Sequence, residues 1–195
     1  MHLFFSTAVW ASKIDNYERI NNEMFNYIIN LQKKDPVGLI KSNFKGWHSK
    51  DFNLKDEQPK IFVEAIKKNI NISLNDMDWD VTKQSVNIKS MWAIINEQAA
   101  WNQKHQHSNS DLSAAYYVHA HENCGDIVFY DPRPARLYKH PIAKSPNKLN
   151  ATVNSVKPEP GLLVLFPSFL EHSVNPNMSN KKRIVISFNI SLEKN

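Results

Sequence analysis

The sequence predicts a mainly β fold with N-terminal helices, in which a β-sandwich or barrel is buttressed by those helices. Helical periodicity occurs only before residue 80, and after Trp79 short β-rich segments follow one another, separated by turn residues. Helices followed by closely spaced strands do not fit a parallel α/β sheet. We expect a single domain over residues 1–195, with helical support at 1–80 and a β core at 81–192.

Two helices are expected in the N-terminal part. Residues 15–31 carry apolar side chains at helical spacing and end before the turn at 36–38; the apolar positions are Tyr17, Ile20, Met24, Ile28 and Leu31. A second helix begins near Pro59, which the first turn of a helix tolerates. One of its faces carries Phe62, Ala65 or Ile66, and Ile70. Between the two helices, SNFKGWHS at 42–49 is predicted to be a loop with a glycine turn and an aromatic anchor.

Five strands are expected in the second part, at residues 86–96, 113–119, 126–130, 161–166 and 183–190. The last alternates cleanly: it directs Ile184, Ile186, Phe188 and Ile190 to one face and Arg183, Val185, Ser187 and Asn189 to the other. Residues 131–160 are rich in proline, lysine and asparagine, and form either an ordered flap or a mobile insertion.

Composition excludes several classes of protein. Hydrophobic residues make up 42% and charged residues 22%, as in soluble globular proteins. No apolar segment is long enough to span a bilayer and the N-terminus does not resemble a signal peptide, so we expect a cytoplasmic protein without a membrane partner. The single cysteine, Cys124, excludes an internal disulfide. The net charge of +5 comes mainly from scattered lysines, which favours a solvated surface over nucleic-acid binding; a homo-oligomer remains open.

The eight histidines are not equivalent. In HQHSNSDLSAAYY, His105 and His107 precede a predicted strand, and His172 follows the strand GLLVLFPS. Histidines at the mouths of neighbouring strands can converge into an open metal site. His119 and His121 form a second pair, at a strand end before a polar turn, and we interpret them as solvent-exposed; His2, His48 and His140 are interpreted as loop residues without a functional role.

Arg183 has two interpretations. On a strand face that otherwise carries small polar and aliphatic residues, its guanidinium suits a bidentate grip of a carboxylate at the bottom of a pocket. Alternatively, Arg183 simply ends the basic run at 181–183.

Together these segments resemble the Fe(II)/2-oxoglutarate-dependent dioxygenases, and within them the 2OG-Fe(II) oxygenase group related to prolyl 4-hydroxylases. The resemblance covers residues 91–190, and SNFKGWHS extends it weakly. It follows the family order of a histidine and an acidic residue one apart, a tyrosine-bearing strand (here SAAYYV), a distal histidine and a basic residue about ten positions later. It implies a double-stranded β-helix (jelly roll), with Fe(II) and 2-oxoglutarate as cofactors and molecular oxygen as co-substrate.

The resemblance also assigns roles to residues. It implies that His105 and His172 ligate iron, that Arg183 pairs with the far carboxylate of 2-oxoglutarate and that Tyr117 donates a hydrogen bond to it. Ser187 and Asn96 are further expected cofactor contacts. The pocket rim or substrate contacts are expected to include Asn96, Trp92, Asp131 and Arg133, and the aromatic residues available to exclude water are Trp92, Tyr116 and Phe166.

His107 occupies the position where the family has an aspartate or glutamate. Imidazole is a good iron ligand, so a site of three histidines is chemically reasonable. Asp111 is the alternative third ligand if it folds back from the SNSD turn, whereas Glu171 is poorly placed because neighbours on an extended chain point in opposite directions. We expect His105, His107 and His172 to be the ligands, with Asp111 in reserve.

The expected function is that of a dioxygenase that hydroxylates a small-molecule or peptidyl substrate with release of succinate and CO2. The alternative is a cupin-like metal-binding jelly roll with non-oxygenase chemistry, or an inactive binding module. The replacement of the family's acid by His107 keeps this alternative open.

Overall fold

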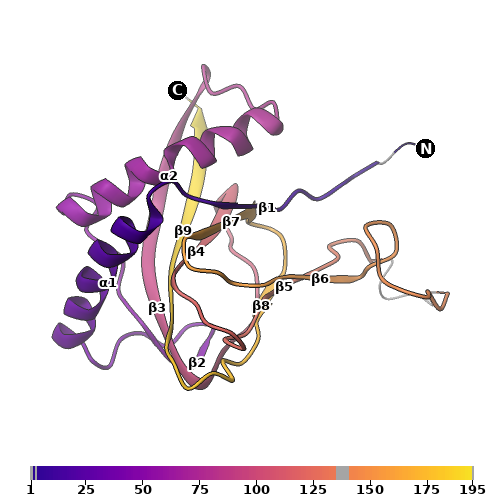
Figure 1. Ribbon diagram of the computed structural model, residues 1–195. Coiled ribbons are helices and arrows are strands. Elements are labelled where there is room, and N and C mark those ends of the chain that lie inside the picture. Colours follow the sequence, from indigo (N-terminus) through magenta and orange to yellow (C-terminus); the bar gives the residue numbers. More distant parts are fainter. Residues whose placement is uncertain (1, 3, 135–140, 195) are drawn as a thin grey trace.

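The computed structural model describes residues 2, 4–134 and 141–194. Its elements are, in order, β1 (Trp10–Lys13), α1 (Tyr17–Lys34), β2 (Asn43–His48), α2 (Glu57–Asp76), β3 (Gln84–His105), β4 (Leu112–His119), β5 (Ile127–Tyr130), β6 (Val153–Val156), β7 (Leu162–Pro167), β8 (His172–Val174) and β9 (Arg183–Lys194). Both expected helices and all five expected strands are present. The mainly β fold with N-terminal helices is confirmed (Figure 1).

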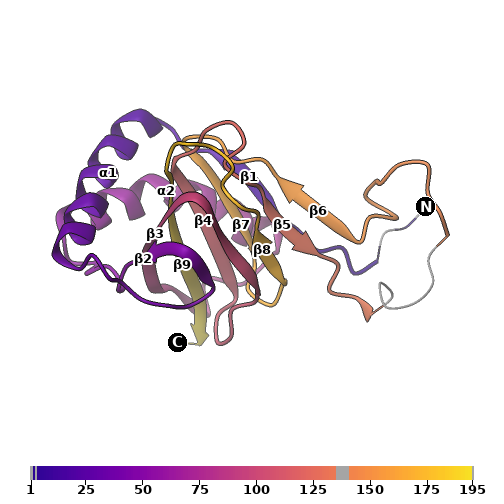
Figure 2. The ribbon, with the colours of Figure 1, turned by 90° about the horizontal axis from the view of Figure 1, so that it is seen from below.

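The paired strands are antiparallel, in the order β1-β7-β4-β9-β3-β8-β5-β6, with β2 added on β3. The long strand β3 links the two halves of this arrangement. Its first part pairs with β9 as far as Asn96, and its last part pairs with β8, where His105 lies opposite His172. Between the two parts Ala99 has a φ of 65°, in the left-handed region that bends a strand. The strand therefore curves around the interior, as Figure 2 shows.

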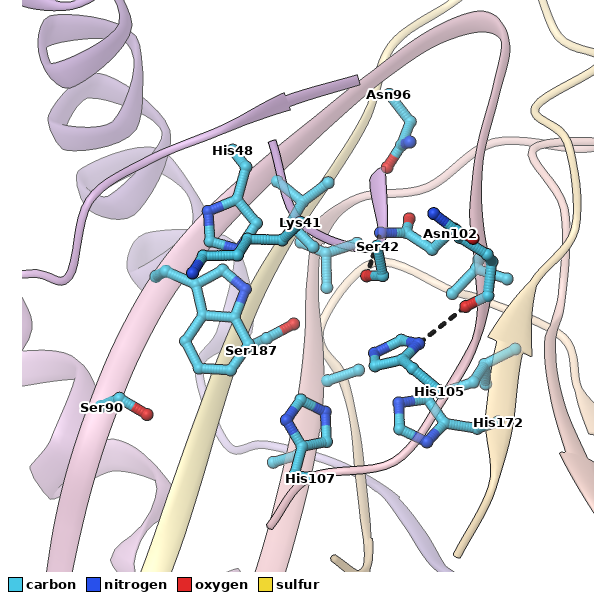
Figure 3. A pocket seen from close by; sticks show the side chains of 18 of the residues that line it. Lys41, Ser42, His48, Ser90, Asn96, Asn102, His105, His107, His172 and Ser187 are labelled. Carbon is cyan, nitrogen blue, oxygen red and sulfur yellow. Dashed lines mark hydrogen bonds between the residues drawn. The ribbon is translucent and has the colours of Figure 1, made fainter. Parts of the chain in front are cut away.

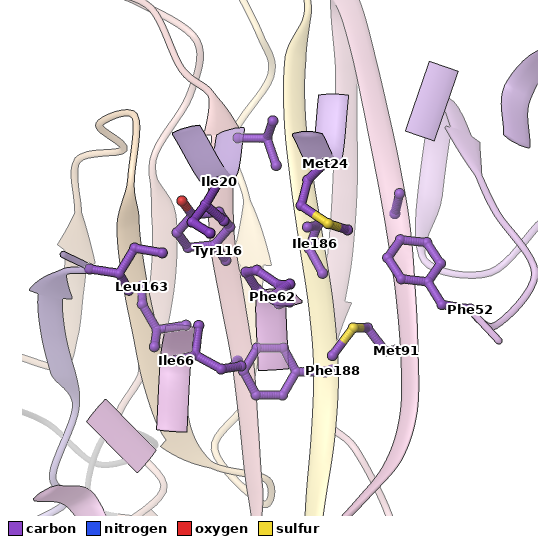
Figure 4. Packing of buried hydrophobic residues seen from close by; sticks show 14 of the residues in the cluster. Ile20, Met24, Phe52, Phe62, Ile66, Met91, Tyr116, Leu163, Ile186 and Phe188 are labelled. Atoms are coloured by element: carbon purple, nitrogen blue, oxygen red, sulfur yellow. The ribbon is translucent and has the colours of Figure 1, made fainter. Parts of the chain in front are cut away.

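The two helices cover one face of the sheet formed by β7, β4, β9 and β3 (Figures 1 and 2). Phe62 of α2 lies at the centre of this core, 5.0 Å from the Tyr116 ring and 6.2 Å from the Phe188 ring between centroids (Figure 4). The alternation of β9 is as predicted, because its isoleucines and Phe188 face the helices while Arg183, Val185 and Ser187 face a cavity. Because the first face of β9 is buried against the helices, the second face is directed into the cavity.

The prediction of a loop at 42–49 is wrong, because Asn43–His48 forms strand β2 against β3. Lys45 has a φ of 56° and the pairing shifts between Phe44 and Gly46, so the side-chain alternation that identifies a strand is interrupted. Trp47 is buried, as expected of an aromatic anchor. Strands β1, β6 and β8 were also missed, since each has at most four residues and shows no periodicity.

The segment at 131–160 contains β6, which forms a hairpin with β5, and an exposed stretch at 141–150. The remaining part, 135–140 with His140, lies outside the described residues, so the choice between flap and insertion stays a prediction. In the described part of the chain, neither helix has the length and apolar character needed to cross a membrane.

Candidate metal and cofactor site

Three histidines converge on one side of the cavity (Figure 3). His105 ends β3, His172 begins β8 opposite it, and His107 follows in the loop before β4. One ligand atom from each side chain lies within 4.8 Å of the others. Two antiparallel strands and the adjoining loop supply these three histidines. Side chains that are far apart in the sequence therefore form one cluster.

Hydrogen bonds and burial prepare these imidazoles for metal binding. Nδ1 of His105 lies 2.7 Å from the Gln103 carbonyl oxygen, and Nδ1 of His172 lies 2.9 Å from that of Leu170. A carbonyl only accepts, so both Nδ1 atoms carry hydrogen and both Nε2 atoms keep their lone pairs. Burial lowers the pKa of His107 to about 4 and that of His172 to about 3, with His105 adding to both shifts. The neutral form is the one that ligates metals.

The loop carrying His107 is tied to the loop between β7 and β8. The His107 amide donates to the Ser168 carbonyl at 3.0 Å, and the Ser168 amide donates to the Asp111 carbonyl at 3.0 Å. The buried Ser168 hydroxyl also lies 2.8 Å from the hydroxyl of Ser113, which donates to Asn189 at 2.8 Å. A hydrogen-bonded network therefore fixes the position of His107.

The carboxylates considered as alternative ligands do not join this cluster. The Asp111 side chain accepts a hydrogen bond from the Leu192 amide at 2.7 Å, and Glu171 forms an ion pair with Lys104 at 2.8 Å. Within the described residues, the cluster capable of holding a metal consists of His105, His107 and His172.

Arg183 lies in the wall of the same cavity, whose volume is about 780 Å³. Its exposed fraction is 0%, so the interpretation as the end of a surface basic run is wrong. Nη1 donates to the carbonyl oxygens of Cys124, Gly125 and Asn175. Nε and Nη2 have no hydrogen-bond partner within the described part of the chain. Buried donors without an acceptor are costly, so the residues present fit a carboxylate that would lie against this edge of the guanidinium.

Other expected cofactor contacts line the cavity near Arg183. Asn96 lies opposite Arg183 on β3, is 1% exposed, and has no partner for either amide atom among the described residues. Burial raises the pKa of Tyr117, with the Arg183 charge opposing, so its hydroxyl stays protonated and able to donate at neutral pH. Ser187 lies further along β9 on the same face.

Several assignments made from the sequence need correction. Tyr116 does not face the cavity: its ring packs against the helices and its hydroxyl donates to Asn21 at 2.6 Å. Asp131 and Arg133 form an ion pair at 2.8 Å and are absent from the cavity lining. His119 and His121 are both half-buried rather than solvent-exposed, and the His119 ring stacks 4.6 Å from that of Phe25.

His48 is one of the cavity residues that sequence reasoning missed. It is buried at the end of β2 and its ring stacks on Trp92 at 5.6 Å, while Trp92 lies 5.8 Å from His107 between ring centroids. Trp92 and Phe166 line the cavity as expected. The aromatic residue next to His48 in the sequence, Trp47, was the available signal for a buried position. The prediction of a loop over this segment obscured that signal.

A family model described as "Putative 2OG-Fe(II) oxygenase" matches residues 90–189. The chain belongs to this family. The match spans β3 to β9, which includes all three histidines of the cluster and Arg183. The family's cofactors are Fe(II) and 2-oxoglutarate, and the donor set and the guanidinium edge of this 2OG-Fe(II) oxygenase fit both. No curated protein sequence is significantly similar to it.

Solved structures share its fold. A prolyl-4-hydroxylase from Pseudomonas putida superposes with a TM-score of 0.64 at 11% identity, covering 95% of this chain and 92% of that one. A collagen prolyl hydroxylase from Paramecium Bursaria Chlorella virus-1 gives 0.58 at 16%, covering 93% and 95%. HygX from Streptomyces hygroscopicus, with nickel and 2-oxoglutarate bound, gives 0.64 at 8%, covering 96% and 84%. The expected double-stranded β-helix is confirmed.

Proposed function

We propose that this oxygenase hydroxylates an unactivated C–H bond of a second substrate with release of succinate and CO2. The observation that carries the proposal is the presence of the three-histidine cluster and the open edge of Arg183 in one cavity. The first suits a metal with free coordination positions, and the second suits the far carboxylate of 2-oxoglutarate.

The proposed reaction balances without another reductant. One atom of O2 enters succinate and the other enters the hydroxylated product. Two electrons come from the decarboxylation of 2-oxoglutarate and two from the C–H bond. Iron, once held by the three histidines, would supply the activation of oxygen.

The residues of the chain contribute binding, orientation and exclusion of water. His105, His107 and His172 would hold the iron, and Arg183 with Tyr117 would fix the far carboxylate of 2-oxoglutarate. Asn96 and Ser187 are proposed as further polar contacts of the cofactor. The large rings of Trp92 and Phe166 lie in the cavity wall, where they reduce the access of water to the reacting groups.

Anaerobic titration with Fe(II) and 2-oxoglutarate tests the proposal. We expect a weak visible charge-transfer band that decays when oxygen is admitted, with formation of succinate. His172→Ala should abolish the band, whereas His121→Ala, in the other H-x-H pair, should leave it unchanged. A wild-type protein that binds Fe(II) but gives neither the band nor succinate would refute the proposal.

The same titration decides the second candidate, a metal-binding jelly roll with non-oxygenase chemistry. The observation that favours it is His107 at the acidic position, because a neutral ligand leaves the metal more positive. Metal binding that 2-oxoglutarate does not alter would support this candidate. The open edge of Arg183 argues for the oxygenase.

A further inference from the structure

The cavity has a second polar region, away from Arg183. Four of its lining residues form what we call the mouth wall: Lys41, His48, Asp51 and Trp92. Lys41 precedes β2 and Asp51 follows it, and both are exposed, whereas His48 and Trp92 are buried. The wall thus runs from solvent into the interior, with Lys41 drawn beside His48 in Figure 3.

The mouth wall presents one cation and one anion that form no ion pair within the described residues. Two other lysines line the cavity, but Lys50 forms an ion pair with Asp35 at 3.7 Å and Lys104 with Glu171 at 2.8 Å. Lys41 and Asp51 form no ion pair with each other or with any other residue that the structure describes.

Both charges act on the same buried ring. Burial lowers the pKa of His48 and its hydrogen bond to the Ser49 carbonyl opposes this, while Lys41 lowers it and Asp51 raises it. Backbone hydrogen bonds place both residues near His48 and Trp92. The Leu39 amide, two residues before Lys41, donates to the His48 carbonyl at 2.8 Å. The Phe52 amide, next to Asp51, donates at 2.6 Å to the carbonyl of Met91, which precedes Trp92. Opposite charges on one wall of the cavity match a ligand that itself carries both an anion and a cation.

Aromatic rings lie in a row between these charges and the cluster of His105, His107 and His172. The His48 ring stacks on Trp92 at 5.6 Å, and the Trp92 ring lies 5.8 Å from that of His107. Ile94 adds an apolar side chain to the same wall. The indole N–H of Trp92 is buried and has no acceptor within the described residues, so an oxygen atom of a ligand could satisfy it.

We propose that the second substrate is a free α-amino acid. Its carboxylate binds Lys41 and its ammonium binds Asp51, so that its side chain lies along Trp92 and reaches towards His107. The proposal rests on the proposed function, because it names the substrate of the same oxygenase. A peptide lacks the paired charges within its chain and would leave both residues without partners.

The test measures succinate formation by the Fe(II) protein with each of the twenty free amino acids. We expect at least one to raise the rate above that without a second substrate. Its carboxamide and N-acetyl derivatives should each have a KM about tenfold higher, because each removes one charge contact. Calorimetry with Ni(II) and 2-oxoglutarate measures binding of the same compounds without turnover.

Two variants assign the ends of the ligand. Lys41→Gln should raise the KM for the amino acid about tenfold and remove the preference over the carboxamide, while the preference over the N-acetyl form persists. Asp51→Asn should do the reverse. Lys60→Gln, on the exposed side of α2, should change neither preference.

Three outcomes would overturn the proposal. No amino acid binds or stimulates turnover; an N-acetyl amino amide is the better substrate, which indicates a peptidyl substrate; or Lys41→Gln and Asp51→Asn leave the KM and both preferences unchanged. The charge-transfer band with 2-oxoglutarate does not require the mouth wall, so its persistence would show that only the substrate assignment had failed.

Discussion

Replacement of Arg183 by methionine tests the cofactor site most directly. The substitution keeps a long side chain but removes the two buried donors, Nε and Nη2, that have no partner in the described part of the chain. A hydrogen bond to a charged group contributes about 1.5–3 kcal/mol, so losing two should cost about 3–6 kcal/mol of binding free energy. The Kd for 2-oxoglutarate should therefore rise by about 10² to 10⁴.

Isothermal titration calorimetry with Ni(II) under anaerobic conditions measures this Kd. The comparison ligand is 2-oxobutanoate, which keeps the metal-binding 2-oxo acid but lacks the far carboxylate. Wild-type protein should bind 2-oxoglutarate far more tightly than 2-oxobutanoate, and Arg183→Met should bind both with similar affinity. Lys182→Met is the matched control, because the neighbouring Lys182 is half-exposed and pairs with Glu97 at 2.9 Å.

Stability must be measured in parallel, because Nη1 of Arg183 also donates to three backbone carbonyls. Circular dichroism during thermal unfolding establishes that the variant is folded at the temperature of the titration. A folded Arg183→Met protein with an unchanged Kd for 2-oxoglutarate would refute the assignment of Arg183 to the far carboxylate.

Three other substitutions probe the supports of the site and the core. Ser113→Ala removes the hydroxyl that links the network behind His107, and should weaken Ni(II) binding about tenfold in competition with a chelator; unchanged affinity would exclude a positioning role. Phe62→Ala should lower the free energy of unfolding by about 3–5 kcal/mol in urea, because the ring is fully buried, and a loss below about 1 kcal/mol would contradict its central place in the core. Gly46→Ala places a methyl group 2.8 Å from the amide nitrogen of Asn96 and should cost about 1–3 kcal/mol in the same assay, whereas a neutral result would mean that Asn96 moves freely.

The sequence predicted most of the helices and strands whose side chains follow a periodic pattern. The alternation in RIVISFNI separated a core face from a cavity face, and the structure has Phe188 on the first and Arg183 on the second. Strand β2 was not predicted, because Lys45 adopts a left-handed backbone conformation that interrupts the side-chain alternation of the strand. Tyr116 and Tyr117 show the limit of composition alone: neighbouring tyrosines on a strand face opposite sides, and only one lines the cavity.

By itself the sequence determined the mainly β class, the helical support and the residue types capable of holding iron and a dicarboxylate. Only the tertiary structure decided which of them meet. The antiparallel pairing of β3 with β8 brings His172 opposite His105, and the network through Ser168 holds His107 beside them while Asp111 is engaged by the Leu192 amide. Such contacts depend on strand register and loop closure over long sequence separations, which local patterns of residues do not encode.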